Sequence, residues 1–437
     1  MHRFWNHSDK RPAPAGLLLL FLLLFLLPGR GAWAGTVTFS ANGGTGTMED
    51  VTTSASSDTL PACRYTRYGY IFRGWVTDLS HETPDYDDQA EVPTDENLTL
   101  YALWEPQLYI VHFDANGGLG SMSDIYGIYN EPLTLPKSTF TTTKFLFNGW
   151  IDTSTGARYA DGGTVENLKS GSTYSRKILT VDAGKPKNTK YSFQSTQGSC
   201  VYDEDGTRYL VTAASINDRA YYKGNLSHYE TVLTKYDLST GEVVARARNL
   251  DFDHGNGICY SPESGHLYIA EGGTLDGYPS GVMEVDQNLK EVKHYTFPLL
   301  NNIWAIAYAD HHFYLIGKNE NSRNSLCVLN DDMQTLSITE LDNYYTNFSS
   351  QGIAADANFI YALSAGFKTY EWKSKQRINV FTHDGTYVGV WTFDIPEEAE
   401  DITVVDQYAY ITTNEKNEST LYRTRLPETT LTAIWKK

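Results

Sequence analysis

The sequence predicts a mainly β protein with two small repeat modules, the second interrupted by an inserted five-bladed β-propeller. Three observations predict this fold class. A block of about 70 residues near the N-terminus recurs once, a fainter unit of about 47 residues recurs five times behind it, and DG, GG and SG pairs break short apolar runs throughout. Aromatic residues make up 13% of the chain and 35 residues are glycine, a composition that favours strands joined by tight turns.

The first 34 residues have the pattern of a secretory signal peptide. Basic residues precede an 11-residue apolar run at 17–27, and Ala32 and Ala34 are the small residues that a signal peptidase accepts. An uncleaved anchor is the alternative, but an apolar run of 11 residues is short for a membrane span. We therefore expect cleavage after Ala34 and an extracellular protein, secreted or associated with the cell envelope.

Charge and cysteine content narrow the class of protein. Cleavage removes four basic residues and one acidic residue, which changes the net charge from −18 to −21. Such acidity argues against a nucleic-acid partner and against a membrane partner after cleavage. The mature chain has four cysteines, too few for a disulfide scaffold; whether Cys200 and Cys259, which share a register, are bonded stays open.

Two blocks near the N-terminus repeat at one spacing. Each copy opens with alternating V-x-F followed by Asn-Gly-Gly, which indicates a half-buried strand entering a turn with positive φ. A glycine precedes the central tryptophan of each copy, which indicates a bulge or a close backbone approach. The matching pairs are VTFSANGG (37–44) with VHFDANGG (111–118), LPACRYTRYGYIFRGW (60–75) with LPKSTFTTTKFLFNGW (135–150), and YDDQAEV (86–92) with YADGGTV (159–165).

These blocks resemble the Listeria–Bacteroides repeat, also described as the internalin B-type repeat. The pattern is a V-x-F-x-A-N-G-G opening, a G-W centre and a closing L-Y-A-x-W strand, which 99–104 supplies in the first copy. The resemblance covers 36–173 together with 429–437. It implies β-grasp-like modules that serve exported bacterial proteins as spacers or adhesive units, and it brings no catalytic residues.

The second copy has no closing strand where the first has one. Trp104 follows Trp75 by 29 residues, whereas the sole candidate partner of Trp150 is Trp435, 285 residues later, in the C-terminal TLTAIWKK. The excess is long enough for a whole domain, and insertion is favoured where the guest's termini lie close together. We expect residues 430–435 to pair within the module of residues 108–173.

The intervening segment repeats five times. Each unit has a strand that ends on a tyrosine, at 209, 268, 314, 361 and 410, and two further strand-like runs follow. About four strands in about 47 residues is typical of a propeller blade. The fifth unit is one strand short, and we expect KYSFQ (190–194) to supply it and close the ring. The expected domains are a signal peptide at 1–34, a first repeat at 35–106, a second at 107–187 plus 426–437, and a propeller at 188–425.

The repeat alignment also predicts one rim of the propeller channel. The residues that open the innermost strands are three amides, one aromatic residue and one carboxylate, with a histidine nearby, and such groups suit a sugar or another polar ligand. The alternative is that they cap backbone groups or hold channel water. The candidate ligand-binding residues are Gln197, His254, Asn256, Trp304, Gln351 and Glu400.

No catalytic, metal or cofactor site is expected. Adjacent strand residues point to opposite faces, so Glu400 and Asp401 should not both aim inward as an acid and base pair. DFDHGNG (251–257) lacks the spacing of a calcium loop, and DEDG (203–206) is interpreted as a hairpin turn. The sequence therefore favours an exported surface or secreted binding and adhesion protein whose partner is an extracellular glycan or an envelope or host protein. The alternative is a secreted carbohydrate-active enzyme, a glycosidase or lyase acting at the channel mouth.

Overall fold

The computed structural model describes most of residues 35–437, and every element in that part of the chain is a β-strand. No segment of the described chain forms a helix with the length and apolarity that crossing a membrane requires. The chain divides into two compact units that meet between Glu105 and Pro106. The expected signal peptide and the expected boundary at 187/188 lie outside the described residues, which exclude 1–34, 54–56, 94–95, 154, 167–174, 183–192, 218–229, 251–254, 273–279, 342–347, 367–375, 394, 407 and 416–417.

The first unit holds the first repeat. Its main sheet has the order β2-β1-β6-β4, in which β1 and β6 run parallel, and a β3–β5 pair lies beside it. Trp75 is fully buried at the centre of its core, against Phe39 and Phe72. The strands are β1 (Thr36–Ser40), β2 (Val51–Thr52), β3 (Ser57–Thr59), β4 (Tyr70–Val76), β5 (Glu91–Pro93) and β6 (Leu98–Pro106).

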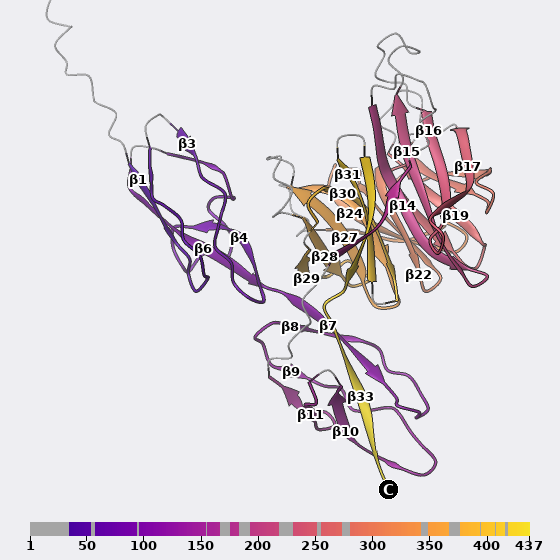
Figure 1. Cartoon of the computed structure of the whole chain (residues 1–437), viewed down its shortest axis with the longest axis horizontal. Helices are drawn as coiled ribbons and strands as arrows, with labels where there is room; N and C mark the ends of the chain where they lie inside the picture. Colours follow the sequence, from indigo (N-terminus) through magenta and orange to yellow (C-terminus); the bar gives the residue numbers. More distant parts are fainter. Residues whose placement is uncertain are drawn as a thin grey trace, which may run out of the picture. The chain divides into compact units, whose positions relative to one another are not determined.

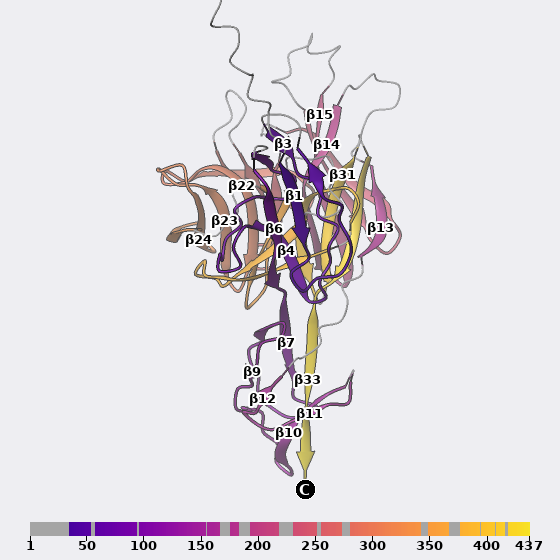
Figure 2. The same ribbon diagram turned by 90° about the vertical axis from the view of Figure 1, so that its left-hand side faces the viewer.

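The second repeat is completed by the last strand of the chain. Its main sheet has the order β11-β10-β33-β7-β8, so β33 lies between β10 and β7, antiparallel to the first and parallel to the second. Figures 1 and 2 both show β33 beside β7. The pairing predicted for residues 430–435 is confirmed. The strands are β7 (Leu108–Asp114), β8 (Ile125–Ile128), β9 (Leu133–Thr134), β10 (Leu146–Asp152), β11 (Arg158–Tyr159), β12 (Thr164–Val165) and β33 (Glu428–Lys436).

β33 takes the place in the second repeat that β6 takes in the first. Each closing strand carries a tryptophan whose Nε1 donates to the alanine carbonyl before the Asn-Gly-Gly turn, and each turn asparagine donates back to that strand. The paired bonds are Trp104 to Ala41 (2.9 Å) and Trp435 to Ala115 (2.9 Å), then Asn42 to Ala102 (2.9 Å) and Asn116 to Ala433 (2.9 Å). The same two contacts in both modules explain why the distant tail completes the second one.

The glycine before each central tryptophan marks a distortion that the sequence predicts. Gly149 has φ 101° and lies within a bulge between Phe147 and Trp150. A Cβ at this position would overlap the carbonyl oxygen of Tyr159. Glycine is therefore required both by the left-handed φ and by the close approach of β11.

Five four-stranded antiparallel sheets form the rest of the second unit, and their innermost strands contact one another in a closed circuit, which is a five-bladed β-propeller. Four blades use consecutive strands: β14 (Phe193–Glu204), β15 (Thr207–Asn217), β16 (Glu230–Asp237), β17 (Glu242–Leu250); β18 (Gly257–Ser261), β19 (His266–Glu271), β20 (Gly281–Val285), β21 (Glu291–Thr296); β22 (Asn301–Ala309), β23 (His312–Lys318), β24 (Asn324–Asn330), β25 (Thr335–Glu340); and β26 (Phe348–Ala355), β27 (Ile360–Gly366), β28 (Arg377–Phe381), β29 (Tyr387–Thr392).

The fifth blade corrects the expected ring closure. It has the order β13-β32-β31-β30, and its outer strand is β13 (Ser175–Val181), not residues 190–194. Residues 190–192 lie outside the described part of the chain, and 193–194 begin the innermost strand of blade one. The closing strand therefore comes from a segment that the sequence assigned to the second repeat. The other strands are β30 (Glu398–Val405), β31 (Tyr408–Glu415) and β32 (Glu418–Arg425).

The tyrosine register behind the blade count is borne out in the core. Tyr268, Tyr314, Tyr361 and Tyr410 are buried on the second strands of their blades, where they pack in the hydrophobic clusters. Tyr209 is half-buried, and the Lys235 ammonium lies 4.1 Å from its ring centroid. The repeated tyrosine is thus a packing residue of each blade.

Candidate functional site

A ring of small residues surrounds the propeller axis. The second residue of each aligned inner-strand unit is Gly198, Gly257, Ala305, Gly352 or Asp401. A Cβ on Gly257 would lie 3.1 Å from the Ala305 Cα, so adjacent inner strands approach closely at this level. Four of the five positions are small, and the fifth carries a carboxylate.

The Asp401 carboxylate joins three blades at that level. Its Oδ2 accepts hydrogen bonds from the backbone N–H of Ser199 at 2.7 Å and of Ile258 at 3.3 Å. Its Oδ1 accepts from the N–H of Ile402 at 2.9 Å, and a Cβ on Gly352 would overlap this carboxylate. Burial raises the pKa of Asp401, and the three amide donors act in the opposite direction.

Sequence reasoning did not identify Asp401 as an axial residue. The aligned sequences nevertheless mark this residue: the position that holds a glycine or alanine in blades one to four holds an aspartate in blade five. The glycines leave room near the axis, and the carboxylate of Asp401 uses it. Asp401 is buried at 1% exposure and holds the ring together through hydrogen bonds.

Four of the six candidate residues lie in the first half of an innermost strand, Asn256 lies just before one, and His254 lies outside the described residues. Three of them occupy β-bulges at the same register of their blades, where the extra residue of a bulge redirects a side chain. Gln197 lies in the Thr196–Gly198 bulge, Gln351 in the Ser350–Ile353 bulge and Glu400 in the Ala399–Asp401 bulge. Trp304 lies in an irregular stretch of β22, and Asn256 immediately precedes β18.

Glu400 differs from the other candidates because it is buried, at 6% exposure. Burial and the neighbouring Glu398 raise the pKa of its carboxyl, and the Asn414 side chain on β31 hydrogen-bonds to it. Glu400 lies in the bulge and Asp401 follows it; both are buried, as consecutive residues of the other innermost strands are. A ligand function for the candidate residues stays a prediction.

A cavity of about 160 Å³ lies farther along the innermost strands, beyond the axial ring. All five innermost strands line it, through residues 200–203, 258–260, 307–308, 353–355 and 402–405. These positions follow the axial residues in every blade, whereas the six candidates precede them. The cavity therefore contains none of the six candidates, and their place at a channel mouth stays a prediction.

One wall of the cavity is aromatic. The rings of Tyr202 and Tyr260 stack at 4.2 Å between centroids, and Tyr308 also lines the cavity. Blades four and five contribute apolar residues to the lining, among them Ala355 and Val405. The Tyr202 hydroxyl is buried and has no hydrogen-bond partner among the residues that the structure describes. Tyr260 and Tyr308 are half-buried, so the exposed parts of their rings can contact a flat ligand.

The cysteines of the cavity are free thiols. Cys200 and Cys259 are both buried and unbonded, which answers the question that their shared register left open. Burial raises the pKa of each thiol, so they stay protonated at neutral pH. They fill space in the wall and are not nucleophiles.

The lining offers little for hydrolysis. Asp203 is its one carboxylate, and Arg208 binds it through Nε at 2.8 Å and through Nη2 at 2.7 Å. Glycoside hydrolysis generally needs two carboxyl groups that flank the bond to be broken. Among the described lining residues, the groups present suit binding better than acid–base catalysis.

Comparisons with known proteins agree with the two repeats. The sequence profile of the Listeria-Bacteroides repeat domain matches residues 36–103 and 109–170. Two curated proteins of Evansella cellulosilytica are similar: "Putative membrane protein", 37% identical over 101 residues, and "Putative Gly-rich membrane protein", 33% identical over 104 residues. Each match covers 23% of this chain, and it spans 15% of the first relative and 11% of the second.

Among solved structures, the chain is similar to a glycosyl hydrolase from Bacteroides ovatus, with 9% identity and a TM-score of 0.39. That match covers 60% of this chain and 95% of the other. The match to the repeat profile agrees with the hydrogen bonds that the two N-terminal modules share. Residues 36–103 and 109–170 are therefore two copies of the Listeria-Bacteroides repeat domain.

Proposed function

We propose that this protein is an exported bacterial binding protein of the cell surface, in which the propeller binds an extracellular glycan. On this proposal the two repeats are β-grasp-like spacers, and the propeller is inserted into the second. The repeat family, which is typical of surface proteins, and the names of the two similar proteins support the location.

The observation that carries the ligand class is the cavity wall of stacked tyrosines. The faces of aromatic rings pack against the apolar faces of sugar rings, and the half-buried rings of Tyr260 and Tyr308 offer such surface in the lining. The carboxylate of Asp203 at the same end can accept hydrogen bonds from sugar hydroxyls.

A glycan panel incubated with residues 35–437 tests this function. We expect at least one glycan to be retained unchanged, and Tyr260→Ala to weaken its binding roughly tenfold, because one stacking surface is lost. Tyr68→Ala is the matched control, since Tyr68 is an exposed tyrosine of the first repeat. Retention that survives Tyr260→Ala would place the ligand elsewhere on the protein.

The same panel distinguishes the competing enzyme. Released sugar products would support a secreted carbohydrate-active enzyme and contradict a pure binding protein. If no glycan were retained and an envelope protein bound instead, the ligand of the propeller would be a protein and not a glycan. Glu400→Gln then serves as a probe: a product-release rate unchanged by this substitution would exclude Glu400 as an essential acid or base.

A further inference from the structure

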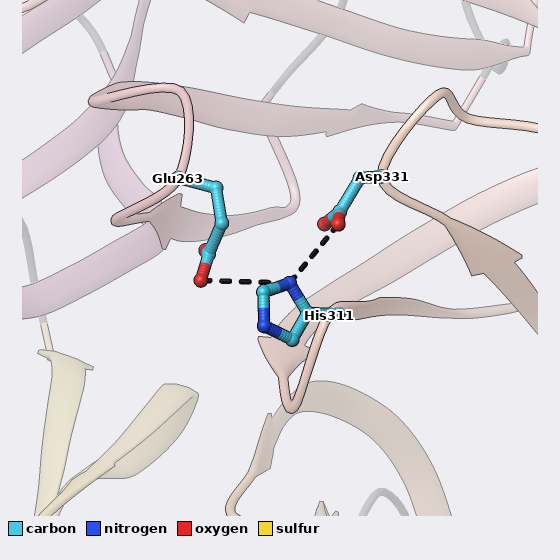
Figure 3. Close-up of side chains that lie close together, drawn as sticks. All are labelled: Glu263, His311 and Asp331. Atoms are coloured by element: carbon cyan, nitrogen blue, oxygen red, sulfur yellow. Dashed lines mark hydrogen bonds and ion pairs between the residues drawn. The ribbon is translucent and has the colours of Figure 1, made fainter.

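Three turns of blades two and three meet beside the cavity wall. Glu263 lies in the β18–β19 turn, His311 in the β22–β23 turn and Asp331 in the β24–β25 turn. Figure 3 shows the imidazole of His311 between the two carboxylates. One ligand atom from each residue lies within 4.8 Å of the others. The three side chains thus converge from separate segments.

The donor atoms are those that bind divalent metals. His311 Nδ1 lies 3.1 Å from Asp331 Oδ2 and 3.7 Å from Glu263 Oε1. One imidazole with two carboxylates is a ligand set used by zinc and by other borderline divalent ions, whereas calcium and magnesium prefer oxygen alone. The imidazole therefore distinguishes this cluster from an ordinary acidic surface.

Tyr308 connects the cluster to the cavity. Its hydroxyl lies 2.6 Å from Glu263 Oε2 and 2.6 Å from Asp331 Oδ1, and the same residue lines the cavity. A phenol has one proton to donate, so it can satisfy one of these two carboxylates at a time. Neither carboxylate forms an ion pair with a lysine or arginine in the part of the chain that the structure describes. The two carboxylates therefore share one phenol proton and one imidazole, and Glu263 Oε2 also accepts a long hydrogen bond from Ser261 Oγ at 3.5 Å.

The backbone also holds His311 at an unusual position. Asp310 and His311 have φ of 47° and 60°, the pair of left-handed residues that a two-residue hairpin normally fills with Asn-Gly. Left-handed φ in a non-glycine residue is uncommon and recurs at functional sites. The turn presents the imidazole of His311 to both carboxylates.

We propose that Glu263, His311 and Asp331 bind one divalent transition-metal ion, of which Zn²⁺ is the best fit to the donor set. The ion joins the turns of two blades and neutralises the carboxylates that hold Tyr308. The side chains of Glu263, His311 and Asp331 are 38%, 63% and 44% exposed, so the ion exchanges with solvent. The site adjoins the proposed glycan cavity through Tyr308, but the proposal does not depend on glycan binding.

Isothermal titration of untagged, EDTA-treated residues 35–437 with ZnCl₂ tests the proposal. We expect one equivalent to bind, and His311→Gly to weaken binding about tenfold or more, because it removes the nitrogen ligand. Glycine is chosen since it accepts the left-handed φ at this position. His312→Ala is the control, because His312 is the next residue, at the start of β23 and outside the cluster, and should leave binding unchanged.

Two further measurements distinguish a metal site that uses His311 from an acidic surface patch. Co²⁺ should give visible absorption bands that His311→Gly abolishes, and zinc binding should weaken as the pH falls toward 5.5, because protons compete for Nδ1. Absence of saturable Zn²⁺ binding would overturn the proposal. So would equal binding by His311→Gly, or tighter binding of CaCl₂ than of ZnCl₂ irrespective of His311, since either result describes an acidic patch.

Discussion

At the scale of single residues, Asp401 does most to fix the centre of the propeller. A buried carboxylate is costly unless hydrogen bonds satisfy it, and three backbone amides from three strands do so here. Gly352 makes room for this carboxylate, because a Cβ at that position would overlap it. The two residues should therefore be energetically coupled.

A double-mutant cycle tests that coupling. Asp401→Ala should destabilise the second unit by about 3 kcal/mol, because it leaves buried N–H donors without an acceptor. Gly352→Ala should also destabilise it, and its cost should fall when Asp401→Ala is already present, since space has been freed. Urea unfolding followed by tryptophan fluorescence measures both. Fully additive effects would show that the two residues do not interact.

His112 is a second residue with a role beyond its own strand. It pairs through Nδ1 with Asp124 at 2.8 Å and through Nε2 with Glu428 of β33 at 3.2 Å. Asp124 also accepts a hydrogen bond from Asn358 in the β26–β27 turn of the propeller. Burial disfavours the charged imidazole, but the ion pairs with the two carboxylates outweigh this and raise the pKa of His112 to about 10.

The raised pKa predicts a direction of pH dependence. A group whose pKa is higher in the folded state contributes stability that is complete below its unfolded value, near 6.5, and is lost as the pH rises through about 10. The free energy of unfolding of the second unit should therefore fall from pH 6.5 to 10 more steeply than in His112→Gln. Equal slopes for both proteins would remove His112 as the cause.

At the scale of elements, β13 is the strand that closes the propeller. It adds the outer edge of blade five through residues 175–181 and pairs with β32. Val181 at its end is buried with Leu210, Tyr236 and Leu421, so the strand also joins blade five to blade one. A strand from before the first blade thus supplies the outer strand of the last blade, which brings both ends of the propeller together.

Substitution in β13 separates this role from surface effects. Val181→Asp should lower the free energy of unfolding by about 3 kcal/mol, because it buries a carboxylate without a partner between two blades. Thr180→Asp, on the exposed face of the same strand, should change it by less than about 0.5 kcal/mol. Denaturant titration of both variants gives the comparison. A similar effect of the two would mean that β13 does not close the ring.

At the scale of the whole molecule, features repeated in the chain could be predicted and unrepeated pairings could not. The offsets between Trp75 and Trp150 predicted two modules, and the five tyrosines predicted five blades. Residues 175–181 and 190–194 both resemble strands, and local pattern cannot decide which of them pairs with β32. The axial role of Asp401 and the convergence of Glu263, His311 and Asp331 likewise depend on contacts between blades that no local spacing records.

The central claim is that β33 completes the second repeat after the chain has passed through the propeller. Hydrogen–deuterium exchange of a chain truncated after residue 427 tests it most directly. β10 and β7 should lose protection, because each loses the strand to which it is bonded, while β1 and β6 of the first repeat should keep theirs. If β10 and β7 stayed as protected as in the full chain, the second repeat would not need β33 and the account would be wrong.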